Sequence, residues 1–170
     1  MKYMKWSILL AASFSTGWIT ADKHNSSQET GKSMKRVTSI GGIFFKCKNP
    51  AAMREWYASH LGLNTDKYGT TFEWRHAVDS SRKGFTQWGP FNETTKYFQP
   101  SGKDFMINYR VENLRELVEQ LKREGVQLVD SIESFEYGSF VHIMDIEGNK
   151  IELWEPNDKE YEKILGAVTR

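Results

Sequence analysis

One stretch decides the fold: GSFVHIMDIEGNKIELWEP, residues 138–156. It predicts two strands joined by a tight hairpin, with Gly148 in the left-handed backbone region that a three-residue hairpin loop requires. The register that closes this loop places His142 directly opposite Glu152. We therefore expect an antiparallel hairpin of fixed register near the end of the chain.

The two faces of this hairpin differ in chemistry, because side chains alternate along a strand. One face is wholly apolar and consists of Val141, Ile143, Ile151 and Leu153. The other face carries Phe140, His142, Met144, Lys150, Glu152 and Trp154. A slip of one residue would mix the two sets, so their clean separation supports the register. We interpret the apolar face as the surface that a helix covers, and the mixed face as the wall of a concave pocket.

The composition bounds the protein class. The chain has 170 residues, of which 39% are hydrophobic and 14% aromatic, enough for one well-packed domain. Lys and Arg number 23 against 22 Asp and Glu, and the formal charge of +1 argues against a nucleic-acid partner. The single cysteine, Cys47, excludes an intrachain disulfide and a cysteine-rich metal site. Its place in an alternating apolar strand predicts a buried, inert thiol.

The first 33 residues differ from the rest. A short basic start at residues 1–5 is followed by an apolar run at 6–21 and a polar linker. This order is typical of a secretory signal peptide, and the apolar run is too short for a membrane span. We expect an exported or periplasmic protein without an integral membrane domain. The alternative is that translation starts at Met34, which would make the protein cytoplasmic.

The first half of the domain begins with an apolar strand at residues 37–47. Asn49 and Pro50 then predict a helix start, and Gly62 its end. Short strands are expected at residues 65–68, 70–76 and 84–88, with a turn at 79–83. Residues 91–104 are mostly polar, and we interpret them as a connector.

The second half repeats this order. A strand at residues 105–111 precedes a helix at 113–124, a strand at 126–132 and the final hairpin. The helix has apolar residues at helical spacing: Leu114, Leu117, Val118 and Leu121. The chain therefore reads as two strand–helix–three-strand modules, at about 37–90 and 105–157. Residues 158–170 form a C-terminal tail that could add a short helix.

These motifs resemble the vicinal oxygen chelate superfamily, which includes glyoxalase I, extradiol dioxygenases, fosfomycin-resistance enzymes and bleomycin-binding proteins. The resemblance covers residues 37–156. It is carried by residues 43–45, Asn49-Pro50, Trp56-Tyr57, residues 61–63, 109–114 and above all 145–153. It implies an α+β fold at residues 34–157, in which two βαβββ modules with curled mixed sheets enclose a cavity.

Enzymes of this superfamily typically hold a divalent metal through side chains on the first, fourth, fifth and eighth strands. The resemblance places Gly42, Thr86, Met106 and Glu152 at these positions. Glycine and methionine offer no ligand to a hard metal, and a threonine hydroxyl is a poor one. We therefore expect no metal and no other cofactor, with Glu152 the one family ligand position retained. The alternative is a shift of the strand alignment that brings in Gln87 or Glu73 as a ligand, which would make a divalent metal possible.

The mixed hairpin face and its neighbouring strand supply the candidate site. His142 and Glu152 could act as general acid and base near neutral pH, or form a salt bridge that orders the sheet. Asn108 and Arg110 could hold a carboxylate or carbonyl of a ligand, or be ordinary solvated residues. The apolar walls would come from Phe44, Phe140 and Trp154, although as core residues they need no ligand.

Two functions follow from this site. The first is a metal-independent protein that binds a small molecule in an aromatic pocket. The alternative is a lyase, isomerase or dioxygenase-type enzyme that uses His142 and Glu152. A purely structural module is less favoured, because buried ionisable groups cost stability. A monomer and a face-packed homodimer both remain open.

Overall fold

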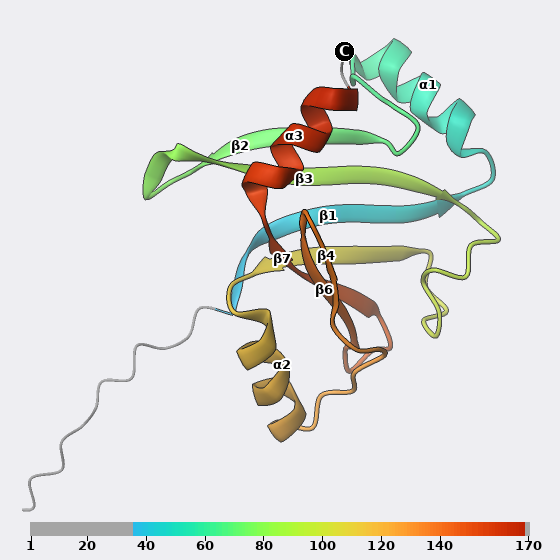
Figure 1. Ribbon diagram of the computed structural model, residues 1–170. Coiled ribbons are helices and arrows are strands. Elements are labelled where there is room, and N and C mark those ends of the chain that lie inside the picture. Colours follow the sequence, from blue (N-terminus) through green and yellow to red (C-terminus); the bar gives the residue numbers. More distant parts are fainter. Residues whose placement is uncertain (1–35, 169–170) are drawn as a thin grey trace, which may run out of the picture. The chain divides into compact units, whose positions relative to one another are not determined.

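The structure is a computed structural model that describes residues 36–168. Its strands form one mixed sheet in the order β2-β3-β1-β4-β7-β6-β5 (Figure 1). The strands are β1 (Val37–Cys47), β2 (Thr70–His76), β3 (Asp79–Asn92), β4 (Phe105–Val111), β5 (Glu133–Phe135), β6 (Gly138–Met144) and β7 (Lys150–Pro156). The helices are α1 (Pro50–Leu61), α2 (Leu114–Arg123) and α3 (Asp158–Val168). The expected signal peptide and linker at residues 1–33 lie outside the described residues.

The two halves of the sheet follow similar paths. In the first half β1 pairs in parallel with β3, which pairs antiparallel with β2. In the second half β4 pairs in parallel with β7, followed by antiparallel β6 and β5. Antiparallel pairing of β1 with β4 joins the halves at the centre. The predicted α+β class is confirmed, whereas an enclosed cavity between curled sheets stays a prediction.

Two predicted strands are wrong. Residues 65–68 form a turn instead, because the Asp66 carboxylate accepts hydrogen bonds from the backbone N–H groups of Tyr68 and Gly69, at 2.7 and 3.0 Å. Such local side-chain bonds compete with strand pairing. Residues 126–132 contribute only a single bridge, Leu128 to Ile143, and the strand β5 begins after them.

The predicted turn at residues 79–83 is also displaced. The structure has its turn at residues 77–78, and β3 begins at Asp79. Opposite charges on the two strands stabilise this longer pairing: Lys83 on β3 lies 3.1 Å from the Glu73 carboxylate on β2. The polar run was mistaken for a loop because its side chains face solvent.

The main hydrophobic core lies between α2 and the hairpin. The predicted hairpin register is confirmed, with His142 opposite Glu152. The apolar hairpin face packs with the buried helix residues Leu114, Leu117, Val118 and Leu121. The Glu155 carboxylate on β7 accepts hydrogen bonds from the first N–H groups of the helix, Asn113 and Leu114, at 3.0 and 3.1 Å. This cap fixes α2 to the strand beside it.

The helix of the first half is formed but hardly buried. The Asn49 side chain caps it at 3.0 Å and Gly62 ends it in the left-handed region, both as predicted. However, α1 has no buried residue, and Leu61 is 58% exposed. Cys47, at the end of the preceding strand, is partly exposed rather than buried as expected. Partial burial still raises the pKa of its thiol.

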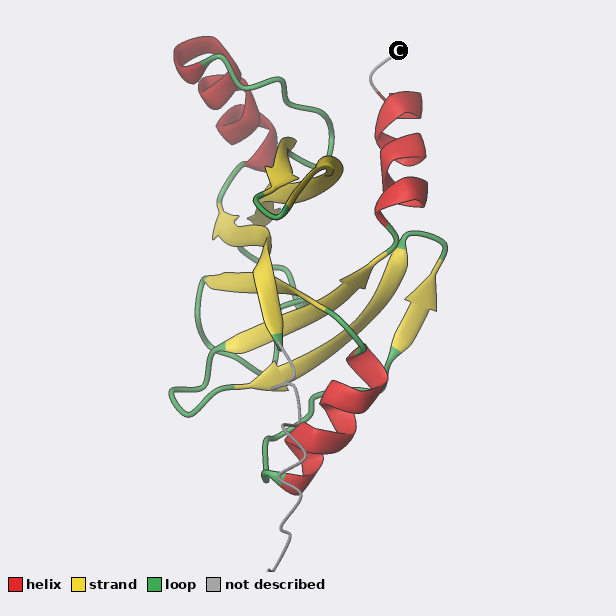
Figure 2. Ribbon diagram, turned by 90° about the vertical axis from the view of Figure 1, so that its left-hand side faces the viewer, coloured by secondary structure: helices red, strands yellow, loops and turns green. Residues whose placement is uncertain are grey.

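The C-terminal helix α3 lies over β3. Lys83 and Phe85 on that strand contact Glu162 and Tyr161 of α3, through an ion pair and an edge-to-face ring contact. Figure 2 shows α3, which runs toward the C label, and α1 on opposite sides of the sheet. Within residues 36–168, no helix is both long and apolar enough to cross a membrane.

Candidate functional site

The sheet register aligns a row of side chains across five strands. Gln87 on β3 is level with Gly42, and Gly42 with Asn108 on β4. Asn108 is level with Glu152 on β7, which faces His142 on β6. Residues directly opposite each other point to the same face of a sheet. The row therefore forms the floor of a single site that crosses from one half to the other.

A pocket of about 340 Å³ lies on this floor. Its aromatic lining in the described chain is Phe44, Tyr97, Phe135, Tyr137, Phe140, Trp154 and Tyr161. Its other lining residues are Gly41, Gln87, Asn108, Glu133, His142 and Glu152. The sequence-predicted residues Phe44, Asn108, Phe140, His142, Glu152 and Trp154 thus lie together. A volume of this size fits a small organic molecule.

His142 is held between two carboxylates at the pocket floor. Its Nε2 lies 3.0 Å from Oε1 of Glu152, and its Nδ1 lies 2.6 Å from Oδ2 of Asp130. The other oxygen of Asp130 accepts the backbone N–H of His142 at 2.8 Å. Both ring nitrogens are therefore occupied within the protein, and the doubly paired ring matches an imidazolium that donates on both sides.

Glu152 accepts three hydrogen bonds and is 4% exposed. Its Oε1 accepts from the Tyr97 hydroxyl as well as from His142, and its Oε2 accepts from Nδ2 of Asn108 at 2.5 Å. Burial and the Glu152 charge both raise the pKa of Tyr97, so its hydroxyl keeps its proton and acts as a donor. Glu152 is thus a buried carboxylate whose two oxygens already have donors.

The pKa values of this pair follow from burial and hydrogen bonding together. Burial alone would lower the pKa of His142, but Glu152 and Asp130 outweigh it and raise that pKa above its ordinary value. Burial alone would raise the pKa of Glu152, but its hydrogen-bond donors outweigh burial and lower it. Both shifts favour the charged forms. The floor therefore stabilises His142 and Glu152 as an ion pair.

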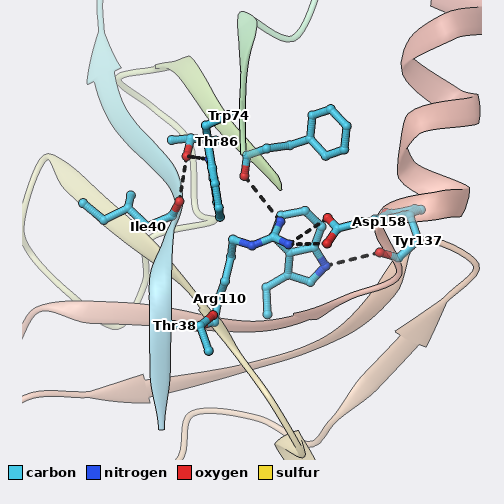
Figure 3. Close-up of polar contacts among 9 residues, drawn as sticks. Thr38, Ile40, Trp74, Thr86, Arg110, Tyr137 and Asp158 are labelled. Atoms are coloured by element: carbon cyan, nitrogen blue, oxygen red, sulfur yellow. Dashed lines mark hydrogen bonds and ion pairs between the residues drawn. The ribbon is translucent and has the colours of Figure 1, made fainter. Parts of the chain in front are cut away.

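Arg110 lies elsewhere, although it was predicted to bind ligand. It is 2% exposed and donates to both oxygens of Asp158 on α3, at 2.7 and 2.6 Å (Figure 3). Its guanidinium carbon lies 5.4 and 5.0 Å from the ring centres of Trp74 and Trp154. Since Asp158 satisfies it and it does not line the pocket, Arg110 anchors α3 in this structure.

The residues present do not fit the superfamily's metal site. Among residues 36–168, no group of three His, Cys, Asp or Glu side chains is placed to hold a metal ion. The Thr86 hydroxyl donates to the Ile40 carbonyl and accepts from the Trp74 indole, outside the pocket (Figure 3). Met106 is fully buried.

The alternative ligands are also engaged. The register places Gln87, rather than Thr86, level with Gly42, but its Oε1 accepts from the Thr71 hydroxyl at 2.6 Å. Glu73 is ion-paired with Arg75 and Lys83 near the protein surface. Function without a metal stays a prediction, and no chemistry is assigned to a metal here.

Sequence reasoning missed several residues that form the site. Tyr97 lies in the connector, Asp130 in the loop before β5, and Tyr137 and Tyr161 in a turn and in α3. The connector, the loop and the turn have no periodic pattern that would orient their side chains, whereas Tyr161 lies in the helix α3. The one available signal was compositional, because the polar connector contains three aromatic residues.

Two other hollows adjoin or flank this pocket. One of about 370 Å³ shares Phe44, Gln87, Tyr137 and Tyr161 with it and extends under α3. A larger one of about 630 Å³ lies at the start of α3, where charged side chains such as Arg82, Lys83 and Glu162 line it. We place the functional site at the aromatic pocket, because its floor combines buried ionisable groups with apolar walls.

Comparisons with known proteins identify the fold. No family model matches the sequence, and neither does any curated protein. Among solved structures, methylmalonyl-CoA epimerase from Streptomyces coelicolor, in complex with 2-nitronate-propionyl-CoA, is similar with a TM-score of 0.54 and 15% identity. The match covers 71% of this chain and 99% of that one.

The epimerase from Mycobacterium tuberculosis is similar with a TM-score of 0.51 and 20% identity, over 74% of this chain and 93% of that one. A glyoxalase/bleomycin resistance protein/dioxygenase superfamily member from Vibrio splendidus has a TM-score of 0.44 and 12% identity. That match covers 68% of this chain and 97% of the other. The chain shares the fold of the two epimerases, which agrees with the fold that the sequence resemblance implied. At these identities the likeness extends to the fold alone.

Proposed function

We propose that this protein binds a small molecule in the aromatic pocket and does so without a metal ion. The observation that carries the proposal is that the two ionisable side chains at the pocket floor already have partners within the protein. Both nitrogens of His142 face carboxylates, and both oxygens of Glu152 accept from protein donors. A general base needs a free lone pair within reach of the substrate. Here both nitrogens of His142 and three of the roughly four acceptor sites of the Glu152 carboxylate are used within the protein, whereas the aromatic walls remain available to a ligand.

The proposal is tested with three compounds that share a ring system: naphthylmethylammonium, naphthylmethanol and naphthoate. Binding is followed by the indole N–H signal of Trp154 in isotope-labelled protein, because this residue lines the pocket. We expect saturable binding of at least one compound. If none of them shifts the Trp154 signal, the proposed function is wrong.

A matched pair of variants places the binding site. Phe140 stacks on Trp154 with ring centres 5.7 Å apart, so Phe140→Leu should weaken binding roughly three- to tenfold. Phe72 is 48% exposed on β2 and does not line the pocket, so Phe72→Leu should leave the affinity unchanged. Equal effects of the two substitutions would place the ligand elsewhere.

A second candidate is an enzyme that moves a proton, such as an isomerase or lyase. The observation in its favour is the continuous chain of hydrogen bonds from Asp130 through His142 and Glu152 to the Tyr97 hydroxyl at the pocket. A ligand that displaced Tyr97 would expose a Glu152 oxygen and allow it to act as a base.

Exchange of a carbon-bound proton separates the two candidates. Methylmalonyl-CoA is a suitable compound, since structurally similar proteins are named as its epimerases. In deuterated water, an enzyme would exchange the acidic C–H proton of this compound, and Glu152→Gln would abolish the exchange. Absence of exchange, combined with pocket binding of the naphthyl compounds, would favour the binding protein.

A further inference from the structure

The charges around the pocket are unevenly paired. Two neighbouring cations are held by carboxylates, Arg110 by Asp158 and His142 by Asp130 and Glu152, while Lys150 donates to the Tyr97 carbonyl at 2.7 Å. Glu133 on β5 also lines the pocket, yet it forms no ion pair with any residue of the described chain. In the described chain, the pocket lining therefore contains one carboxylate without a counter-ion and no cationic side chain other than the paired His142.

The aromatic walls of the pocket, like the unpaired carboxylate, favour a positively charged ligand. Phe140 and Trp154 stack with an interplanar angle of 6°, and Phe135 stacks on Tyr137 at 5.4 Å. The face of an aromatic ring is the negative end of its quadrupole and attracts a cation within about 6 Å. In the described chain seven aromatic side chains line this one small hollow, and such a lining favours a positively charged ligand over a negative one.

The floor adds a buried acceptor. Asn108 is 2% exposed and donates its amide N–H to Glu152, which fixes the orientation of the side chain. Its Oδ1 accepts no hydrogen bond from the described residues. An unpaired carbonyl oxygen is costly to bury, and the negative end of its dipole adds to the negative potential of the floor.

We propose that the pocket selects an organic cation, specifically an aromatic ammonium compound whose charged nitrogen lies between the ring faces and the Glu133 carboxylate. This inference rests on the proposed function and deepens it. It differs from the sequence-based expectation that Arg110 would hold a ligand carboxylate. Because Asp158 already occupies that guanidinium, the remaining recognition chemistry at the pocket is acidic and aromatic.

The test uses the three naphthyl compounds and two variants. Naphthylmethylammonium should bind on the order of tenfold tighter than naphthylmethanol, with naphthoate the weakest. Glu133→Gln should reduce the preference for the cation about threefold. Glu136→Gln is the matched control, because Glu136 is exposed on the same segment and does not line the pocket. Melting temperatures of both variants would confirm that they remain folded.

The outcomes separate this inference from the proposed function. Equal affinity for the three compounds, or tighter binding of naphthoate, would overturn the charge preference while the binding function stands. Binding of none of them would overturn both. A preference for the cation that Glu133→Gln leaves intact would overturn the role given to Glu133.

Discussion

The two halves of the sheet carry helices of opposite character. In α2, Leu114, Leu117, Val118 and Leu121 are all buried against the hairpin, whereas α1 has no buried residue. Both helices begin and end at the residues that local signals predict, within one or two positions. Capping thus determines where a helix forms, but its apolar pattern determines whether it contributes a core.

The second half also contributes more than the first half to the pocket face. The second half supplies most of the polar floor, including Asn108, His142 and Glu152. The first half contributes less to the floor, and α3 covers part of this face, anchored by Asp158 and Tyr161. The C-terminal helix therefore ties the two halves together, since it follows the second half and packs on the first.

The largest expected effect tests the difference between α1 and α2. Leu117→Ala should lower the free energy of unfolding by about 3 kcal/mol, because it leaves a cavity in the packed core. The same substitution at Leu61 on α1, which is 58% exposed, should cost less than about 0.5 kcal/mol. Urea unfolding of both variants measures these values. Similar losses would show that the two helices contribute alike.

A smaller expected effect tests whether the ion pair between Asp158 and Arg110 anchors α3 to the sheet. Asp158→Asn removes the counter-ion of buried Arg110 and should cost about 2 kcal/mol, less than for a fully buried pair because Asp158 is partly exposed. Glu160→Gln on the same helix breaks an exposed pair with Lys163 and should cost only a small fraction of that. Hydrogen exchange of α3 amides should accelerate in Asp158→Asn alone. Unchanged exchange would argue against the anchor.

The smallest effect concerns pH and the ion pair of the second half. A raised folded-state pKa of His142 means that its stabilisation is complete below about pH 6.5, the unfolded-state pKa of histidine, and is lost as pH rises through the folded value. In Asp130→Asn only Glu152 raises this pKa, so the stabilisation should be smaller and its loss should be complete at a lower pH.

Urea unfolding across the neutral to alkaline range measures this shift. Glu136→Gln is the control, because it removes a carboxylate from the same half without touching His142, and its profile should follow that of the unsubstituted protein. If the stability of Asp130→Asn changes with pH in the same way as that of the unsubstituted protein, Asp130 does not stabilise the imidazolium of His142.

The sequence predicted much of the second half because its signals are local. The alternation that separates Val141 from His142 and the glycine at position 148 specify the hairpin and its register. The same register brought His142, Glu152, Phe140 and Trp154 to one pocket. In the first half, the turn at residues 65–68 depends on the hydrogen bonds of one side chain, Asp66. Such bonds produce no periodic sequence pattern, so the sequence predicts a strand there instead.

By itself, the sequence determined the α+β class, the hairpin register and the apolar side of α2. It also determined which aromatic and ionisable side chains share one face of the hairpin. Periodicity and turn chemistry act over a few residues, so they can be read without the fold. Only the tertiary structure decided the partners of the charged groups. Arg110 was expected to bind a ligand, but it pairs with Asp158, which lies 48 residues away in the sequence. Glu152 and His142 bind Tyr97 and Asp130, which come from irregular segments. Such pairings depend on where loops and the last helix pack, and that is settled by contacts between distant parts of the chain.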